Sequence, residues 1–164
     1  MKSTGYTRPL LWILLLNAAC TFFQSGAAAD MATDQAKLSQ LLKGSGYQFT
    51  QKTDSVWAID LDGKSLGNYK LIGASEQGML VMFVIIATKA ELNLNQDLAY
   101  KMLKLNHEFD RVKVGIDDDG DAFVRVDLSI RTLDEEEFKL NVEQVANSAD
   151  EAYADIKPYL RQQP

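Results

Sequence analysis

The chain has very few of the side chains that form disulfides, metal sites or nucleophilic catalytic sites. Its 164 residues include one cysteine, Cys20, and one histidine, His107. A disulfide within the chain needs two cysteines and is excluded. A zinc site or a catalytic pair would need a second nitrogen or sulfur ligand, or a nucleophile set beside His107, and no such setting is found. Gly-x-Ser-x-Gly and phosphate-binding glycine motifs are also missing. The sequence therefore predicts a protein that is not an enzyme and uses no cofactor.

Basic residues and linker segments are also scarce. The chain has 17 Lys and Arg against 23 Asp and Glu, a net charge of −6. The first 29 residues carry two basic and no acidic side chains, so the remainder has a net charge of −8. This acidity argues against binding to nucleic acid or to anionic membrane surfaces. No repeat, low-complexity tract or Pro/Gly/Ser-rich linker follows Asp30, which predicts one domain over residues 30–164.

The N-terminus has the features of a secretory signal peptide. Lys2 and Arg8 precede an apolar run, Leu10–Phe23, and an Ala-x-Ala sequence ends at Ala29. We therefore expect cleavage after Ala29 and a periplasmic or secreted protein. The apolar run is short for a membrane span, which needs about 20 residues, so no membrane insertion of the mature chain is expected.

A second interpretation of the N-terminus involves its cysteine. The segment Leu16–Cys20 resembles the cleavage box of bacterial lipoproteins, although Asn17 departs from the aliphatic residue that such boxes prefer. The alternative is therefore a lipoprotein anchored at Cys20, which a lipid chain would tether to the membrane.

Two alternating segments flank the most acidic stretch of the chain. Apolar residues fill even positions on both sides of the turn, which predicts a hairpin with one apolar face: Val112, Val114, Ile116, Ala122, Val124, Val126, Leu128 and Ile130. Even positions pair with even ones if the loop holds three residues, Asp118-Asp119-Gly120, with Gly120 in the left-handed conformation. This register places Lys113 opposite Arg125 and Arg111 opposite Asp127.

The acidic turn itself has two interpretations. Measured from Gly120, an EF-hand calcium loop would need an acidic residue at Gly115 and a glutamate at Val126, so the pattern fails at both ends. A solvated structural turn is the first interpretation. Asp117, Asp119 and Asp121 remain weak candidates for a different cation site, and a periplasmic ligand- or cation-binding sensor that uses the Asp117–Asp121 turn, together with His107, is the alternative function.

The remaining pattern predicts helix, four strands, helix, two strands, helix, an α+β fold with a mainly antiparallel sheet. Thr33 or Asp34 should cap the first helix, which ends at Gly44 or Gly46. The first four strands are expected at Tyr47–Gln51, Val56–Asp60, Asn68–Ser75 and Met79–Ala87, with turns at Asp62-Gly63 and Gln77-Gly78. Met79–Ala87 contains no polar residue, which predicts a central strand buried on both faces.

The last two helices have clear start signals. Asn95 should cap one whose inner side carries Leu98, Ala99, Met102, Leu103 and Leu105. Asp134 and Glu137 form a capping box for the other, and Pro158 should end it. Its buried stripe is expected to be Phe138, Val142, Val145, Ala149, Ala152 and Ile156.

Aromatic residues at strand positions are the remaining candidates for a binding site. Tyr47, Phe49, Trp57 and Tyr69 could line a ligand groove, but aromatic residues on strands more often belong to the core, and we favour that interpretation.

Several segments of the chain form a recognisable pattern: Leu103–Asn106, Phe109–Val114, the Asp117–Asp121 turn, Arg125–Leu128 and Asp150–Tyr153. With these segments, and with its early helix followed by Gly46-Tyr47 and strands, the chain resembles the YbjN-like family over roughly Asp34 to Leu160. That family is named for a proposed role in bacterial sensory transduction. The resemblance implies a fold similar to that of type III secretion chaperones, small acidic α+β proteins that dimerise and hold extended partner segments. The expected function is that of an exported non-enzymatic protein-interaction domain, chaperone-like, adaptor-like or regulatory, which binds a peptide or protein partner and forms a homodimer.

Overall fold

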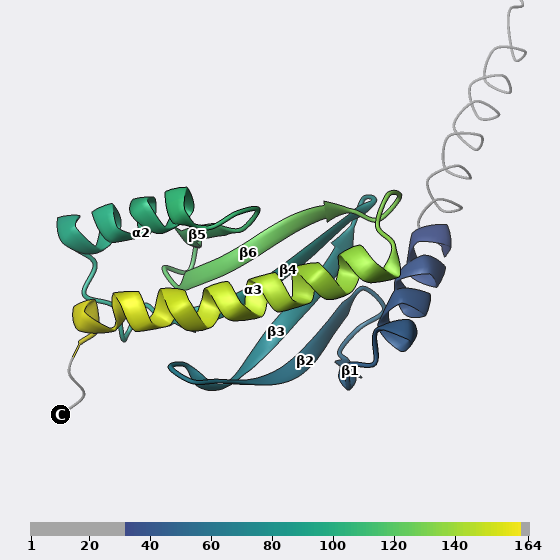
Figure 1. Ribbon diagram of the computed structural model, residues 1–164, viewed down its shortest axis with the longest axis horizontal. Helices are drawn as coiled ribbons and strands as arrows, with labels where there is room; N and C mark the ends of the chain where they lie inside the picture. Colours follow the sequence, from purple (N-terminus) through teal and green to yellow (C-terminus); the bar gives the residue numbers. More distant parts are fainter. Residues whose placement is uncertain (1–31, 162–164) are drawn as a thin grey trace, which may run out of the picture.

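The computed structural model describes residues 32–161, which form one six-stranded antiparallel sheet and the helices packed against it (Figure 1). The strand order is β1-β2-β3-β4-β6-β5. An N-terminal helix covers residues 32–45, and the other elements are β1 (Phe49–Gln51), β2 (Val56–Gly63), β3 (Gly67–Glu76), β4 (Met79–Ala87), α2 (Gln96–Glu108), β5 (Lys113–Ile116), β6 (Ala122–Ser129), α3 (Glu135–Ile156) and the 3-10 turn η1 (Lys157–Tyr159). The predicted α+β class and element order are confirmed.

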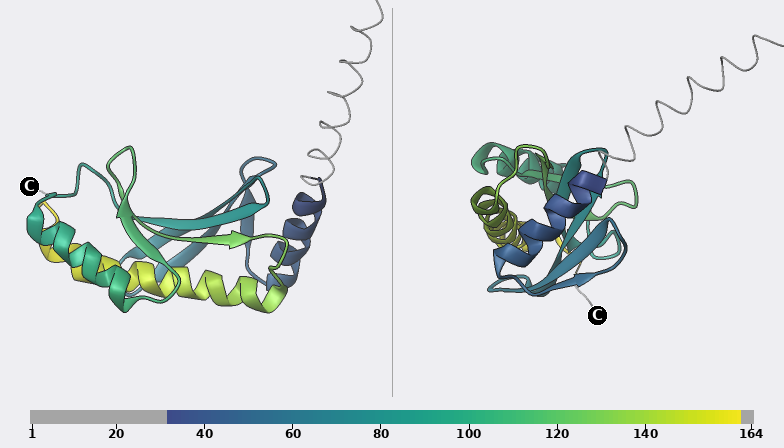
Figure 2. Two further views of the ribbon diagram at one scale, coloured as in Figure 1. Left: turned by 90° about the horizontal axis from the view of Figure 1, so that it is seen from above. Right: turned by 90° about the vertical axis from the view of Figure 1, so that its right-hand side faces the viewer.

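The long helix α3 runs across one face of the sheet and forms the core with it (Figure 2). Its start is capped as predicted, since the Asp134 carboxylate accepts a hydrogen bond from the Glu137 N–H at 2.8 Å. All six residues of the predicted stripe are buried. The ring of Phe138 lies 5.8 Å from that of Trp57 on β2, and Leu38, Leu41 and Leu42 of the N-terminal helix close the same core at one end of the sheet.

Several element ends differ from the prediction. Thr33 and Asp34 do not cap the N-terminal helix, because both lie inside it. The helix ends as expected before Gly46, whose φ of +80° favours glycine. The turn predicted at Asp62-Gly63 is wrong, because β2 continues to Gly63 and the chain turns at residues 64–66. The Asp150 carboxylate of α3 holds that later turn, accepting hydrogen bonds at 2.8 Å from the N–H groups of Ser65 and Leu66.

The central strand β4 is not buried on both faces, contrary to the prediction. Leu80, Met82, Val84 and Ile86 are buried under α3, whereas the residues between them stay partly exposed. Their side chains point to the opposite face of the sheet, which no helix of the described chain covers (Figure 2). We call this the open face, and its apolar members are Val56, Ala58, Ile72, Ala74, Met79, Val81, Phe83, Ile85 and Phe123, of which Ala58 is buried by its neighbours.

The buried stripe of helix α2 is narrower than predicted. Asn95 caps it, accepting a hydrogen bond from the Leu98 N–H at 2.9 Å, and Leu98, Met102 and Leu105 are buried. Ala99 and Leu103, which were expected on the inner side, are exposed. The side of α2 that faces β5 and α3 is occupied by Leu98, Met102 and Leu105, which follow one another at spacings of four and three. Ala99 and Leu103 lie outside that side of the helix.

The acidic hairpin follows the predicted register for most of its length. Val114 pairs with Val124, Lys113 pairs with Arg125, and Gly120 has a φ of +91°. The pairing of Arg111 with Asp127 is wrong, because β5 begins only at Lys113. Arg111 has a φ of +65°, which turns the chain there, and its guanidinium pairs with Glu137 of α3 instead.

The Asp150 contact predicts a pH-dependent change in stability. Partial burial acts to raise the pKa of Asp150, but the backbone N–H groups of Leu66, Ser65 and Lys64 outweigh it and lower the pKa below its ordinary value. The stabilisation is therefore complete above the ordinary aspartate pKa of about 4 and is lost as the pH falls through the folded-state value. We expect Asp150→Asn to unfold about 1 kcal/mol more easily at pH 7, because a neutral amide oxygen accepts these bonds more weakly.

Urea unfolding at pH 7 and pH 3 measures this effect, and the gap between Asp150→Asn and the wild type should shrink at the lower pH. Glu151→Gln is the control, since Glu151 is exposed on the same helix. A gap of equal size at both pH values would contradict the assignment.

Candidate functional site

The three carboxylates proposed as weak cation ligands do not converge. Asp117 accepts a hydrogen bond from the Asp121 N–H at 2.8 Å, and Asp121 accepts one from the Lys89 N–H at 2.7 Å, while Asp119 is exposed. His107, at the last turn of α2, is exposed as well. Among residues 32–161, no group of three His, Cys, Asp or Glu side chains is placed to hold a metal ion. The structure therefore gives Asp117 and Asp121 local roles in closing and anchoring the hairpin.

These local bonds predict the response to cations. Since Asp117 and Asp121 already accept backbone hydrogen bonds, millimolar calcium, magnesium or zinc should leave the melting temperature unchanged. Thermal unfolding with each ion, against a chelator control, measures this. A rise that is abolished by Asp119→Asn would support the cation-sensor alternative.

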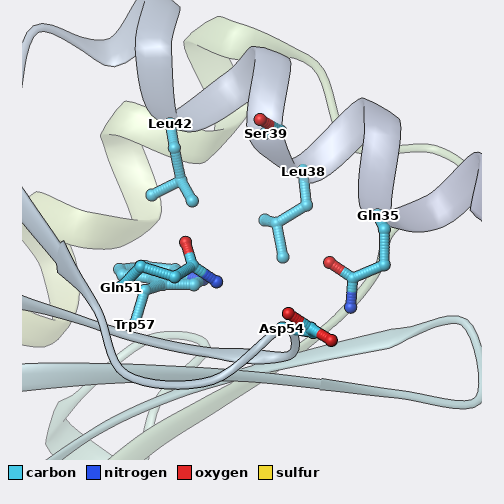
Figure 3. Close-up of a pocket in the computed structure, with 7 residues that line it drawn as sticks. All are labelled: Gln35, Leu38, Ser39, Leu42, Gln51, Asp54 and Trp57. Atoms are coloured by element: carbon cyan, nitrogen blue, oxygen red, sulfur yellow. The ribbon is translucent and has the colours of Figure 1, made fainter.

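A cavity of about 460 Å³ lies between the N-terminal helix and the β1–β2 hairpin (Figure 3). Leu38, Leu42 and Trp57 form its apolar lining, and its polar lining is Gln35, Ser39, Gln51 and Asp54. We call it the Trp57 cavity. In Figure 3 the helix lies above, with Leu38 and Leu42 directed toward Trp57, and Gln51 is the cross-strand partner of Trp57. The lining therefore combines three apolar and four polar side chains, which could contact both the apolar and the polar atoms of another molecule.

Trp57 is fully buried, but its one polar atom has no partner. The indole Nε1 is a buried donor without a hydrogen bond within the described chain. An unpaired buried donor costs about 1–3 kcal/mol, and an acceptor from outside would relieve this cost only if a side chain that covers the indole moved aside. The indole fits because its cross-strand neighbour is Gly73, where an added Cβ would lie 2.1 Å from the ring.

The cavity borders an edge strand. β1 pairs with β2 on one side only and stands last in the strand order. Its residues Thr50 and Gln51 are exposed. A strand with one free edge offers unpaired N–H and C=O groups to an added strand.

The four aromatic candidates divide between the core and the cavity. Tyr47, Phe49 and Tyr69 pack against the core, as favoured, and the Tyr69 hydroxyl donates to the Ala146 carbonyl at 3.1 Å. Burial, followed by the charges of Asp150 and Asp62, raises the pKa of Tyr69. Trp57 belongs to both, since it is a core residue that also lines the cavity.

Gly73 is predicted to control how Trp57 packs. Gly73→Ala forces the indole to shift against buried neighbours, and we expect a loss of about 1–3 kcal/mol in unfolding free energy. Gly115→Ala is the matched control, because its Cβ meets only the tip of Phe123, on the open face, where the ring has room to move. Urea unfolding and the fluorescence maximum of Trp57 measure both variants. Equal losses would contradict the role of the indole contact.

The charged residues beside the open face form a second feature. Asp127 contacts Lys113 and Arg125, with the Arg125 Nε at 2.7 Å from a carboxylate oxygen. Burial acts to raise the pKa of Asp127, but the hydrogen bonds from Arg125 and Lys113 outweigh it and lower that pKa. Asp127 thus relieves the repulsion between the facing side chains of Lys113 and Arg125, and the three residues together have a net charge of +1.

A protein-family model described as "Putative bacterial sensory transduction regulator", the YbjN model, matches residues 34–158. The chain belongs to the YbjN family. This confirms the resemblance found in the sequence. No curated protein matches the chain by sequence.

Solved structures show the same fold. YbjN from E. coli is 18% identical with a TM-score of 0.57, covering 76% of this chain and 93% of that one. A chain of the ExoU–SpcU complex from the type III secretion system of Pseudomonas aeruginosa is 16% identical with a TM-score of 0.51, covering 74% and 96%. A chain of the HopA1–SchA chaperone–effector complex is 11% identical with a TM-score of 0.55, covering 74% and 97%. The similarity in fold to type III secretion chaperones is therefore confirmed.

The predicted signal peptide, its cleavage after Ala29 and the alternative lipid anchor at Cys20 lie outside the described residues. They remain predictions. Within residues 32–161, the helices are too short or too polar to span a bilayer.

Proposed function

We propose that this member of the YbjN family is an exported, non-enzymatic interaction domain that binds an extended segment of a protein partner and acts as a homodimer. The observation that carries the proposal is the Trp57 cavity beside the free edge of β1. A cavity for a side chain next to a free strand edge would suit a chaperone- or adaptor-like role. The predicted signal peptide would place the partner in the periplasm or outside the cell.

The two features suit one mode of binding. A partner strand that adds to the edge of β1 gains main-chain hydrogen bonds, and every second side chain of that strand points to the same side. One such side chain, aliphatic or aromatic, would enter the cavity and displace the groups that now cover Leu38, Leu42 and Trp57, which are 0–3% exposed. Once the indole is uncovered, a carbonyl or hydroxyl oxygen of the partner would accept from the Trp57 Nε1, and Gln35, Ser39 and Asp54 would supply polar contacts around it.

The structural comparisons support the same function. Two of the similar structures are complexes between proteins, one of them a chaperone–effector complex. At 11–18% identity these structures share the fold, and the partner of this chain is to be identified by experiment.

Trp57 also provides the measurement. The chain has two tryptophans, and the other, Trp12, lies in the predicted leader, so the fluorescence of the exported protein reports on the cavity. Peptides selected from a phage-displayed random library should favour extended sequences with a large apolar residue and should shift the emission of Trp57.

A variant at the cavity tests the site directly. Ser39→Phe places a large ring in the cavity lining and should weaken binding of a selected peptide at least tenfold, about 1.4 kcal/mol. Gln40→Phe is the matched control, since Gln40 is exposed on the same helix but does not line the cavity. Titration of both variants by fluorescence or calorimetry gives the comparison. If Ser39→Phe binds as tightly as Gln40→Phe, the partner does not use the Trp57 cavity.

A further inference from the structure

The sheet has two edge strands, β1 and β5, which stand at the two ends of the strand order. Along an antiparallel edge strand, residues alternate between those whose N–H and C=O groups bond to the neighbouring strand and those whose groups turn outward. An added strand pairs with the outward groups. The two edges can therefore be compared by asking what the outward groups of each strand already bind.

The outward groups of β1 are free. The Lys52 N–H donates to the Val56 carbonyl at 2.8 Å, and this pair continues the register between β1 and β2. Alternation then turns the backbone groups of Phe49 and Gln51 outward. Within the described part of the chain, no side chain bonds to these groups. We call them the β1 edge, and it is open to an added strand.

The outward groups of β5 are not free. The Asp117 N–H donates to the Asp121 carbonyl at 3.0 Å, which continues the register between β5 and β6 and turns Val114 and Ile116 outward. At Val114 both groups are bonded to the side chain of Asn106 on α2. The Val114 N–H donates to Asn106 Oδ1 at 2.9 Å, and the Val114 carbonyl accepts from Asn106 Nδ2 at 2.8 Å. We call the outward groups of Val114 and Ile116 the β5 edge.

The Asn106 side chain bonds to this edge as a peptide group of an added strand would. A primary amide carries a donor and an acceptor side by side, which an aspartate or an aliphatic side chain does not. The same Nδ2 also donates to the Met102 carbonyl at 3.0 Å, one turn earlier on α2, and this bond fixes the orientation of the amide. An asparagine at this position therefore satisfies both groups of Val114 at once.

The last turn of α2 is held beside β5 by other contacts as well (Figure 1). Gln144 of α3 donates to the Asp110 carbonyl at 2.7 Å, and Arg111 pairs with Glu137 of α3. The corner between α2 and β5 is thus anchored to α3 independently of Asn106. Substitution of Asn106 therefore removes the amide from the edge and leaves the corner in place.

We infer that Asn106 closes the β5 edge and so confines strand addition to β1. A sheet with two open edges could pair with extended segments at both ends, and natural proteins limit such pairing by covering one edge. With β5 closed, each domain takes one partner strand, at the end of the sheet that carries the Trp57 cavity. This inference rests on the proposed function for what β1 binds, whereas the closing of β5 can be tested without it.

The test closes one edge and opens the other. Gln51→Pro removes an outward N–H from β1 and leaves the bonds to β2, because proline is tolerated where the N–H of an edge strand faces solvent. Asn106→Ala opens β5 at an exposed helix position, where alanine favours the helix. Peptides selected from a phage-displayed random library against the double variant should bind it at least about tenfold more tightly than Gln51→Pro alone, through the backbone bonds regained at β5.

Two further variants locate the new binding site. Val114→Pro, added to the double variant, should abolish the gain, because it removes the outward N–H of β5 without removing a bond to β6. Gln144→Ala, combined with Gln51→Pro, is the matched control for Asn106→Ala. It removes a side-chain amide from the same corner and leaves Val114 bonded to Asn106, so no gain is expected.

The outcomes separate this inference from the proposed function. A double variant that is folded by circular dichroism but binds no peptide more tightly than Gln51→Pro alone overturns the inference, and so does an equal gain with Gln144→Ala. If Gln51→Pro binds the peptides of the wild-type protein at full affinity, the proposed function at β1 fails. The comparison at β5 between the double variant and its Val114→Pro derivative then still decides the inference.

Hydrogen exchange gives a second measurement that needs no peptide. The Val114 amide should exchange at least about tenfold faster in Asn106→Ala than in the wild type, because its acceptor is lost. The Gly115 amide is the internal control, since alternation directs it to β6, and its exchange rate should not change. Unchanged exchange at Val114 overturns the inference.

Discussion

The packing of Trp57 over Gly73 and against Phe138 joins the parts of this domain that are far apart in sequence. The indole of β2 occupies the space that a side chain at position 73 would take, and Phe138 of α3 contacts its ring. The N-terminal helix closes over the same indole with Leu38 and Leu42. Because three elements meet on one ring, the position of the N-terminal helix, and with it the shape of the cavity, depends on a glycine in the neighbouring strand.

The sequence predicts the elements well where local chemistry decides them. Asn95 and Asp134 cap their helices through their own side chains, and the hairpin register follows from counting apolar positions around Gly120. Prediction fails where a distant residue decides. The turn after β2 lies beyond Gly63 because Asp150, more than 80 residues away in the sequence, accepts its backbone N–H groups. The prediction for β4 failed for the same reason. Its apolar composition favours burial on both faces, but it does not specify which elements cover them.

The candidate site was only partly visible in the sequence. Trp57 stood out as an aromatic residue on a strand, and its unpaired Nε1 could not be foreseen, because that depends on which groups surround the ring. Gln35 and Ser39 gave no signal, since polar residues on a helix are normally solvated. The acidic turn was the more conspicuous feature, yet Asp117 and Asp121 form hydrogen bonds with backbone groups close by. A cluster of one residue type in the sequence was therefore a weaker indication of the candidate site than the contact between the N-terminal helix and β2 in the structure.

The length of α3 separates the two ends of the described chain. Its 22 residues rise about 33 Å at about 1.5 Å per residue, and the N-terminal helix and the C-terminal end lie at opposite ends of the molecule (Figure 1). The point of attachment to a solid support therefore determines which surface is presented to solution. A protein held through residue 161 turns the Trp57 cavity outward, whereas one held through its N-terminus brings that cavity close to the support. A tether in the living cell would impose the same geometry on any partner that approaches.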